Sequence, residues 1–440
     1  MKKVDLTQGN VFKVLTLLTI PIVGSSLLQF TYNLIDMIWV GRLGSDAVAS
    51  IGSSSFFLGL GLSINALVVI GGGIKISHAL GRNDEDDVRS YINNALFINL
   101  IIATIYSLGI FFFGKYLIGF LEISEVNVRE DAIAYLKICA PSMFFSFFNL
   151  LYVRIFGCYG RNSNALKISA TGVIINIILD PICIYILNFG VLGAGIATLI
   201  ANFTMFILFN IKSNGLFKFD SKISLDKAKL LEISRLGIPM ASQRVLFTIV
   251  NIVLARIISM FGADAIAGQK IGLQIESITF MIIGGLNIAV SSYTGQNFGA
   301  KEYKRVIEGY RAALKLGVIY ALVTSSIFLL VPDLLASIFV SDKNTIEISS
   351  IYIRIIALSQ VFSAIEMISN GLFTGLGMPK IPANISIVFT ILRIPFALFF
   401  INYLGINGVW VSICLSSILK GITAYIMYLI KVRKDPKYAL

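Results

Sequence analysis

Residues 14–40 read VLTLLTIPIVGSSLLQFTYNLIDMIWV and contain a single charged residue, Asp36. About 20 apolar residues suffice for a helix to cross the ~30 Å hydrocarbon core of a bilayer. Lys2 and Lys3 precede this run as they would in a signal peptide, but no small-residue cleavage site follows and the apolar sequence continues to Val40. We therefore interpret residues 14–40 as the first membrane helix.

Segments of the same kind recur along the whole chain. Of its 440 residues, 56% are hydrophobic and 14% are charged, whereas a soluble domain has about 25% charged residues. The pattern predicts an all-α membrane protein with twelve transmembrane helices. We place them at about 14–40, 47–78, 91–114, 132–155, 164–188, 191–211, 237–261, 265–297, 309–331, 346–372, 382–403 and 407–430.

The distribution of Lys and Arg predicts the orientation in the membrane. If the N-terminus is cytoplasmic, the cytoplasmic segments hold 23 basic residues, within 2–13, 82–89, 161–167, 212–235, 301–315, 380 and 431–437. The opposite loops hold only Arg42, Lys115, Arg129 and Lys343. Basic residues concentrate in cytoplasmic loops, so we expect a cell-membrane protein with both termini in the cytoplasm. The net charge of +12 then implies no nucleic-acid partner.

The chain contains an internal repeat. Its longest polar stretch, 212–235, is predicted to be a cytoplasmic linker between two six-helix halves, 1–211 and 236–440. Six helices per half give both halves the same orientation, related by an axis along the membrane normal. Shifts of 214 to 218 residues superpose Ile20-Pro21 on Ile238-Pro239, Asn33 on Asn251, Gly44 on Gly262, Asp46 on Asp264, Gly157 on Gly371 and Pro181 on Pro395.

Two acids are expected inside the hydrocarbon of the first half, Asp36 and Asp180. An ionised Asp at the bilayer centre costs at least about 2.5–3.5 kcal/mol, so such acids usually face the interior of a helix bundle and mark functional sites. In the first span, Gln29 and Asn33 share a helix face with Asp36, at i, i+4 and i+7. These two amides are candidates for substrate binding or gating.

In the fifth span, Asn176 and Asp180 are spaced i, i+4, just before a proline, and Thr198 follows in the sixth. Carboxylate, amide and hydroxyl oxygens are the ligands that a small hard cation prefers. The repeat supports a special role, because the positions equivalent to Asp36, Asn176, Asp180 and Thr198 hold Leu254, Thr390, Ile394 and Ile413. The alternative is that each Asp only accepts hydrogen bonds from neighbouring helices.

The second half carries its own intramembrane acids, Glu276 and Glu366, together with Arg244, Arg256 and Arg393. Pairing acids with bases inside a bundle lowers the cost of removing them from water, so the two Glu residues are candidates for structural ion pairs. The alternative is that they contact substrate or gate its path. The sequence leaves both interpretations open.

Several other chemistries find no support in the sequence. The GxxxxGK[ST] pattern of nucleotide-binding loops is missing, so transport energy must come from an ion gradient or from the substrate itself. The four cysteines show neither zinc nor disulfide spacing. With one histidine and no HExxH motif, we expect neither an intramembrane enzyme nor a cofactor.

These features resemble the multidrug and toxic compound extrusion (MATE) transporters, in particular their prokaryotic DinF-like branch. The resemblance covers nearly the entire chain. Its motifs are DMIWVGRLG at 36–44, GQNFGA at 295–300, and Asn176 with Asp180-Pro181.

The resemblance implies two six-helix lobes in a V that export amphipathic organic cations in exchange for Na⁺ or H⁺. The cation site of DinF-like relatives falls here on Asp36, Asn176, Asp180 and Thr198. The neutral oxygens of Asn176 and Thr198 favour Na⁺ over H⁺. We expect a monomer whose partners are small organic cations, the coupling cation and the lipid bilayer. The alternative is a flippase of the same superfamily for lipid-linked oligosaccharide or peptidoglycan precursors, although those generally have fourteen spans or a basic central cavity.

Overall fold

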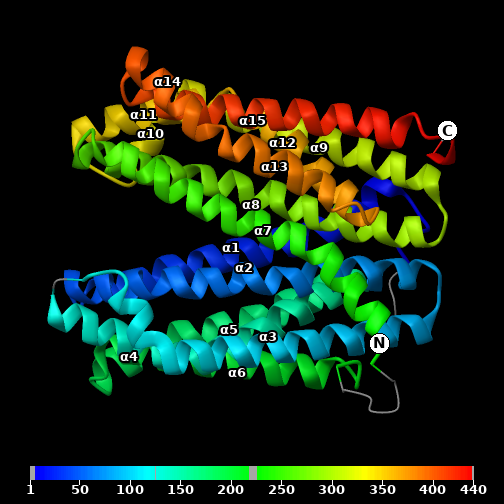
Figure 1. The fold of residues 1–440 in the computed structure, drawn as a ribbon, viewed down its shortest axis with the longest axis horizontal. Coiled ribbons are helices and arrows are strands. Elements are labelled where there is room, and N and C mark those ends of the chain that lie inside the picture. The colour runs from blue at the N-terminus through cyan, green and yellow to red at the C-terminus, as the bar shows by residue number, and fades with distance from the viewer. Residues whose placement is uncertain (1–4, 124, 218–224, 439–440) are drawn as a thin grey trace. The chain divides into compact units, whose positions relative to one another are not determined.

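The computed structural model describes residues 5–123, 125–217 and 225–438, and every regular element among them is a helix (Figure 1). The first half contains α1 (Val11–Gly41), α2 (Ser45–Gly81), α3 (Glu85–Gly119), α4 (Val126–Cys158), α5 (Asn162–Pro181), the π-helix η1 (Ile182–Ile186) and α6 (Gly190–Lys212). Four basic residues used above to predict orientation, Lys2, Lys3, Lys218 and Lys222, lie outside the described residues.

The second half has more breaks in its helices. It contains α7 (Lys227–Ser259), α8 (Ala263–Gly299), α9 (Tyr303–Leu330), α10 (Pro332–Ser337), α11 (Lys343–Ala357), α12 (Gln360–Gly375), α13 (Lys380–Ile391), α14 (Arg393–Leu404), α15 (Asn407–Tyr428), η2 (Leu429–Arg433) and η3 (Pro436–Tyr438). Eleven segments of the described chain are long and apolar enough to cross a membrane, and α11 with α12, bent by 56°, makes a twelfth. The prediction of an all-α protein with twelve spans is confirmed.

Local signals set where several helices begin. Asp84 caps α3 by accepting a hydrogen bond from the backbone N–H of Asp87, and Asp342 caps α11 through Thr345. The backbone N–H and the hydroxyl of Thr345 both donate to Asp342 at 2.8 Å, which lowers the pKa of that exposed carboxyl. The repeat-equivalent residues Gly44 and Gly262 precede α2 and α8 with φ of 113° and 96°, a backbone conformation that favours glycine.

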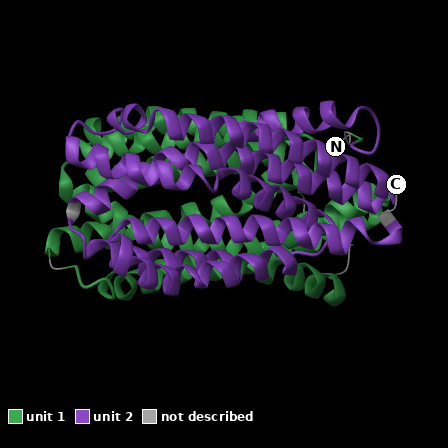
Figure 2. Cartoon of the chain, turned by 90° about the horizontal axis from the view of Figure 1, so that it is seen from above, with its two compact units in different colours: residues 1–5, 24–241 green, residues 6–23, 242–440 purple. Residues whose placement is uncertain are grey.

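The chain packs as two compact units, coloured separately in Figure 2. The described part of unit 1 is residue 5 with residues 24–241, and that of unit 2 is residues 6–23 and 242–438. Each unit has its own apolar core, built around side chains such as Phe156 in unit 1 and Tyr310 in unit 2. The division of the chain into repeat halves at 211 and 235 stays a prediction. The packing units are divided differently, within α1 and within α7, so that each unit contains part of both helices.

The start of α1 and the segment before it pack into unit 2 through the GQNFGA motif. The side-chain amide of Asn297 donates to the carbonyl oxygen of Leu6 at 3.2 Å, and Arg305 Nη1 donates to that of Gly9 at 3.0 Å. The buried side chains of Leu15 and Leu18 join the same core. The motif therefore anchors the N-terminal segment within unit 2.

The start of α7 packs into unit 1 because two glycines allow close backbone approach. A Cβ atom on Gly71 would collide with the backbone carbonyl of Ile233, and one on Gly237 would collide with that of Leu67. Without side chains at these positions, α2 and α7 cross with their backbones in contact. No larger residue fits at either glycine without displacing a helix.

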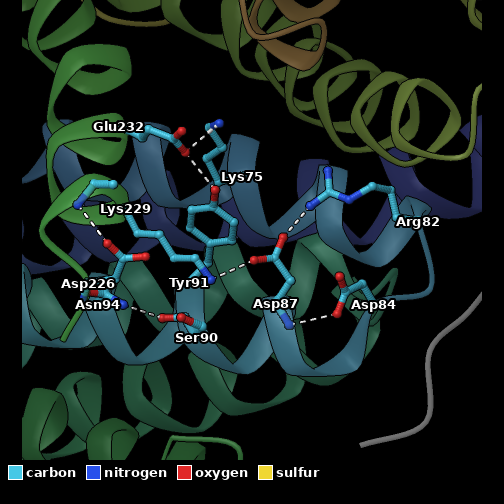
Figure 3. A network of polar contacts seen from close by, with 11 residues as sticks. Lys75, Arg82, Asp84, Asp87, Ser90, Tyr91, Asn94, Asp226, Lys229 and Glu232 are labelled. Carbon is cyan, nitrogen blue, oxygen red and sulfur yellow. Dashed lines mark hydrogen bonds and ion pairs between the residues drawn. The ribbon is translucent and has the colours of Figure 1, made fainter. Parts of the chain in front are cut away.

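A polar network reinforces this crossing (Figure 3). Glu232 of α7 forms an ion pair with Lys75 at 2.7 Å and accepts a hydrogen bond from the Tyr91 hydroxyl at 2.6 Å. One turn earlier on α7, Lys229 forms an ion pair with Asp87 at 2.7 Å. The first turns of α7 are thus held to α2 and α3 by charge as well as by packing.

Candidate functional site

The candidate site in unit 1 is built where the fifth span changes its helical geometry. Pro181 lacks a backbone N–H, so the carbonyl of Ile177 loses its usual helical donor, and the chain continues as the π-helix η1. Asp180 stands directly before this proline and is fully buried. The helix irregularity therefore places a carboxylate inside the unit, next to backbone that cannot complete its own hydrogen bonding.

Asn176 lies one turn before Asp180 and is buried with it. Its side-chain Nδ2 donates to Asp180 Oδ1 at 3.2 Å. The two remaining side-chain oxygens, Asn176 Oδ1 and Asp180 Oδ2, are buried and have no hydrogen-bond partner. Because a buried polar atom without a partner is costly, two such acceptors side by side fit a bound cation, a proton or an ordered water.

Helices α1 and α6 contribute the other members of the cluster. The hydroxyls of Tyr32 and Thr198 lie 3.4 Å apart and share a hydrogen bond. Asp36 follows Tyr32 by one helical turn and is half-buried. The carboxylates of Asp36 and Asp180 are close enough to interact electrostatically with each other and with the Tyr32 phenol. The structure therefore brings together all four residues predicted as a cation site.

Three residues of this cluster were missed by sequence reasoning. Tyr32 links Thr198 to the two acids, and its spacing of one turn before Asp36 was a usable signal. On α4, Tyr135 and Cys139 are buried and interact electrostatically with Asp36. Nothing in their sequence context marks them as neighbours of an acid in another helix.

The two predicted amides of α1 lie apart from these buried oxygens. Gln29 Nε2 donates to Asn33 Oδ1 at 3.2 Å, and both side chains are exposed. Their hydrogen bond confirms that the two residues share a helix face. Their role in substrate binding or gating stays a prediction.

The oxygen ligands present are of the hard type. Among the described residues, no group of three or more His, Cys, Asp or Glu side chains is arranged to hold a metal ion. A cation in this cluster would therefore be held by two carboxylates together with amide and hydroxyl oxygens. That set suits Na⁺ rather than a transition metal, which prefers imidazole or thiolate.

The predicted acids of the second half lie in unit 2. Glu276 is buried and accepts hydrogen bonds from the Tyr352 hydroxyl at 2.9 Å and from Gln360 Nε2 at 3.5 Å. Glu366 is half-buried and interacts electrostatically with Arg393. Within the described residues, neither acid forms an ion pair shorter than 4.0 Å. The direct ion pairs considered for these acids are not formed.

The three basic residues considered with these acids differ in burial. Arg244 and Arg256 are exposed on α7, whereas Arg393 is buried at the start of α14. A further buried cation, Lys420 of α15, was missed by sequence reasoning. The cost of an isolated charge inside a membrane span, the argument that identified Asp36, applies equally to this lysine.

Comparison with known proteins assigns the family. The MatE family model matches residues 21–182 and 239–399. The probable multidrug resistance protein NorM of Thermotoga maritima is 27% identical over 95% of this chain and 92% of its own length. The probable multidrug resistance protein YpnP of Bacillus subtilis is 26% identical over 97% of this chain and 97% of its own length. The multidrug export protein MepA of Staphylococcus aureus is 25% identical over 97% of this chain and 95% of its own length.

Solved structures agree with this assignment at the level of the fold. An outward-facing multidrug resistance MATE family transporter of the MOP superfamily matches with a TM-score of 0.91 and 24% identity, over 98% of both chains. A MOP superfamily transporter from Pyrococcus furiosus matches with a TM-score of 0.89 and 24% identity over the same shares. Two matched segments of similar length, one in each half, also fit the internal repeat. The chain belongs to the MatE family and is a multi-pass membrane transporter of the MATE type.

Proposed function

We propose that this transporter exports amphipathic organic cations and that the entry of a coupling cation at Asp36, Asn176, Asp180 and Thr198 drives the export. The observation that carries the proposal is the pair of buried, unpartnered oxygens on Asn176 and Asp180. They lie beside a second carboxylate, Asp36. Similarity to proteins named for multidrug resistance and multidrug export supports the choice of substrate class.

Na⁺ is the favoured coupling ion. A proton bridges at most two of these oxygens, whereas Na⁺ accepts several oxygen ligands at once and can engage both carboxylates together with the amide and hydroxyl oxygens. The membrane potential adds to the drive only for charge that enters in excess of the charge carried out by the drug, by about 2.3 kcal/mol per net charge across 100 mV, or roughly 50-fold accumulation. With the termini in the cytoplasm, as the charge bias predicts, the ion would enter from outside as the drug leaves.

Vesicles with imposed gradients test this proposal. Ethidium would be added outside everted membrane vesicles containing the protein, and its uptake followed by fluorescence under an outward Na⁺ gradient alone, a pH gradient alone, or neither. We expect transport under the Na⁺ gradient. Unchanged transport in Na⁺-free medium that depends on the pH gradient would replace Na⁺ by H⁺. Flipping of a lipid-linked saccharide, with no dye transport under either gradient, would favour the flippase.

Asp36→Asn connects the activity to the site. It removes a charge but preserves shape, so we expect Na⁺-driven transport to fall at least about tenfold, because hydrogen bonds and ligands involving ionised groups are the strong ones. Asp46→Asn is the matched control, since Asp46 is an exposed carboxylate at the start of α2. Equal transport by the two variants would contradict a role for Asp36.

A further inference from the structure

Among the described residues of unit 2, two cations are buried without a direct counterion. Lys420 on α15 is 3% exposed and Arg393 at the start of α14 is 7% exposed. Within the part of the chain that the structure describes, neither forms an ion pair shorter than 4.0 Å. Moving a charge from water into protein costs several kcal/mol, and a direct ion pair is the usual compensation. Neither of these two side chains has that compensation.

Hydroxyl groups solvate both cations. The Lys420 ammonium donates to Thr390 Oγ1 at 2.8 Å and to Ser386 Oγ at 3.4 Å. Arg393 donates through Nε to Ser416 Oγ at 3.1 Å and through Nη2 to Ser417 Oγ at 3.4 Å. Each donor nitrogen in these contacts meets a neutral oxygen. Neutral hydroxyls keep the cations in place but leave their charge available to an anion.

The helix that carries Arg393 is broken at this point. Helix α13 ends at Ile391, α14 begins at Arg393, and Pro395 removes the donor that the carbonyl of Ile391 would receive. In transporters, interrupted helices at corresponding positions of two repeats point to binding sites. Pro395 corresponds in the repeat to Pro181, which stands beside Asp180 in the unit 1 cluster.

The surroundings offer further groups to an aromatic substrate with an anionic substituent. The guanidinium of Arg393 lies 5.6 Å from the centre of the Phe247 ring, a flat apolar surface. Gln243 donates to Ser386 Oγ at 2.9 Å, and its own side-chain oxygen is buried without a partner. Buried polar atoms of this kind mark positions where a ligand or water completes the hydrogen bonding.

The acids nearby act at longer range. Glu366 interacts electrostatically with both Lys420 and Arg393, and Glu276 interacts with Arg393. The hydrogen bonds of Glu276 go to Tyr352 and Gln360. Glu366 is half-buried and makes no ion pair shorter than 4.0 Å within the described residues. A substrate carboxylate would therefore compete with Glu366 for electrostatic attraction to Lys420 and Arg393.

We propose that Lys420 and Arg393 form a subsite in unit 2 for the carboxylate of amphipathic, zwitterionic substrates. A carboxylate there would accept charge-assisted hydrogen bonds from an ammonium and a guanidinium, while its aromatic part contacts Phe247. The subsite would select among substrates by a group that the acidic cluster of unit 1 cannot bind. This inference rests on the proposed export of organic cations, because it divides those substrates by whether they also carry a carboxylate.

Two dyes that differ in one group test the subsite directly. Rhodamine B carries a free carboxylate, and rhodamine B ethyl ester is the same fluorophore with that carboxylate blocked. Binding of each dye to the purified protein in lipid nanodiscs would be measured by equilibrium dialysis, with empty nanodiscs subtracted. We expect rhodamine B to bind at least about tenfold more tightly than its ester, as a charge-assisted contact predicts.

The variants separate this role from a structural one. Lys420→Met should bring the ratio of the two dissociation constants to about one, while Lys420→Arg should retain most of it, since the charge is kept. Glu366→Gln should tighten rhodamine B binding about threefold by removing a competing anion. Lys431→Gln, which removes an exposed cation from the same end of the chain, is the matched control and should change neither constant.

The outcomes distinguish this inference from the proposed function. Binding of both dyes with equal affinity in the parent protein overturns the subsite and leaves cation export standing. A preference for rhodamine B that survives in Lys420→Met also overturns it. Lys420-dependent binding of rhodamine B without any binding of the ester supports the subsite but contradicts the export of simple organic cations.

Discussion

The fifth span of each half is broken beside a proline, but the charged groups at the two breaks have opposite signs. In unit 1, Pro181 follows a buried acid, Asp180, whose second oxygen has no partner. In unit 2, the equivalent Pro395 follows a buried base, Arg393, and Lys420 bonds to Thr390, the equivalent of Asn176. The repeat thus preserves the backbone irregularity and varies the charge. The break leaves backbone polar groups without helical partners in both units. The side chains beside it determine whether the site attracts a cation or an anion.

Asp180→Asn should have the largest effect. It keeps the size of the side chain and removes the charge at the centre of the unit 1 cluster, so we expect Na⁺-driven dye transport to fall at least about 30-fold, the loss of a buried charged ligand being worth about 2 kcal/mol or more. Transport rates in the vesicle assay measure this. Asp264→Asn, at an exposed acid in the first turn of α8, should retain normal rates, and a normal rate in Asp180→Asn would remove the unit 1 site from the mechanism.

Thr198→Val and Tyr32→Phe sharpen the description of the same cluster. Each removes one hydroxyl of the pair that lies 3.4 Å apart. Because a neutral ligand contributes about 0.5–1.5 kcal/mol, we expect the Na⁺ concentration for half-maximal transport to rise about three- to tenfold in Thr198→Val, and less in Tyr32→Phe. A series of transport rates against Na⁺ concentration provides the value. An unchanged half-maximal concentration in both variants would place the ion away from α6.

Lys420→Met tests whether the unit 2 cations are there for stability. Replacing a buried charge that has no direct counterion by an apolar side chain of similar length is often neutral or stabilising. We expect the melting temperature of the purified protein to rise by about 1–4 °C, since about 1 kcal/mol shifts a unit of this size by about 2–4 °C. Thermal unfolding in detergent measures this change. A fall of several degrees would indicate that the lysine is a structural element.

Glu232→Gln should have the smallest effect. Its equivalent in α1 is Val14, so the ion pair with Lys75 belongs to α7 alone. The two side chains are 44% and 25% exposed, and partly exposed pairs contribute at most about 1 kcal/mol. We expect the melting temperature to fall by no more than about 3 °C. A larger fall would show that polar contacts, rather than the glycine crossing, hold the start of α7.

Much of this architecture follows from the sequence because membranes impose strict rules. Twelve apolar segments predict twelve spans, since only helices and closed barrels satisfy their backbone hydrogen bonds in lipid. The 56° bend between α11 and α12 was not predicted, because Leu358 and Ser359 carry no proline or glycine signal. The division of α1 and α7 between the units depends on tertiary contacts, which helical periodicity does not report.

A residue of the candidate site was easier to predict the more free energy its placement in the hydrocarbon costs. Acids inside hydrocarbon are so costly that Asp36 and Asp180 could be identified one at a time, and their helical spacing added Asn176. Tyr32 was missed because phenols in a bundle usually serve packing. Lys420 was missed although its cost is as high as that of an acid, because the only polar residues at helical spacing from it, such as Ser416 and Ser417, are neutral hydroxyls that are common in membrane helices.

The N-terminal segment has a consequence for how this chain is made. Leu6 receives its hydrogen bond from Asn297, 291 positions later, so its segment cannot reach its native contacts before α8 is synthesised. The start of α7 shows the reverse order, because its partners α2 and α3 are already synthesised. Unit 1 can therefore close before α8 is synthesised, whereas unit 2 cannot. During that interval residues 6–23 lack their native partners, and a chain truncated before α8 would leave them so permanently.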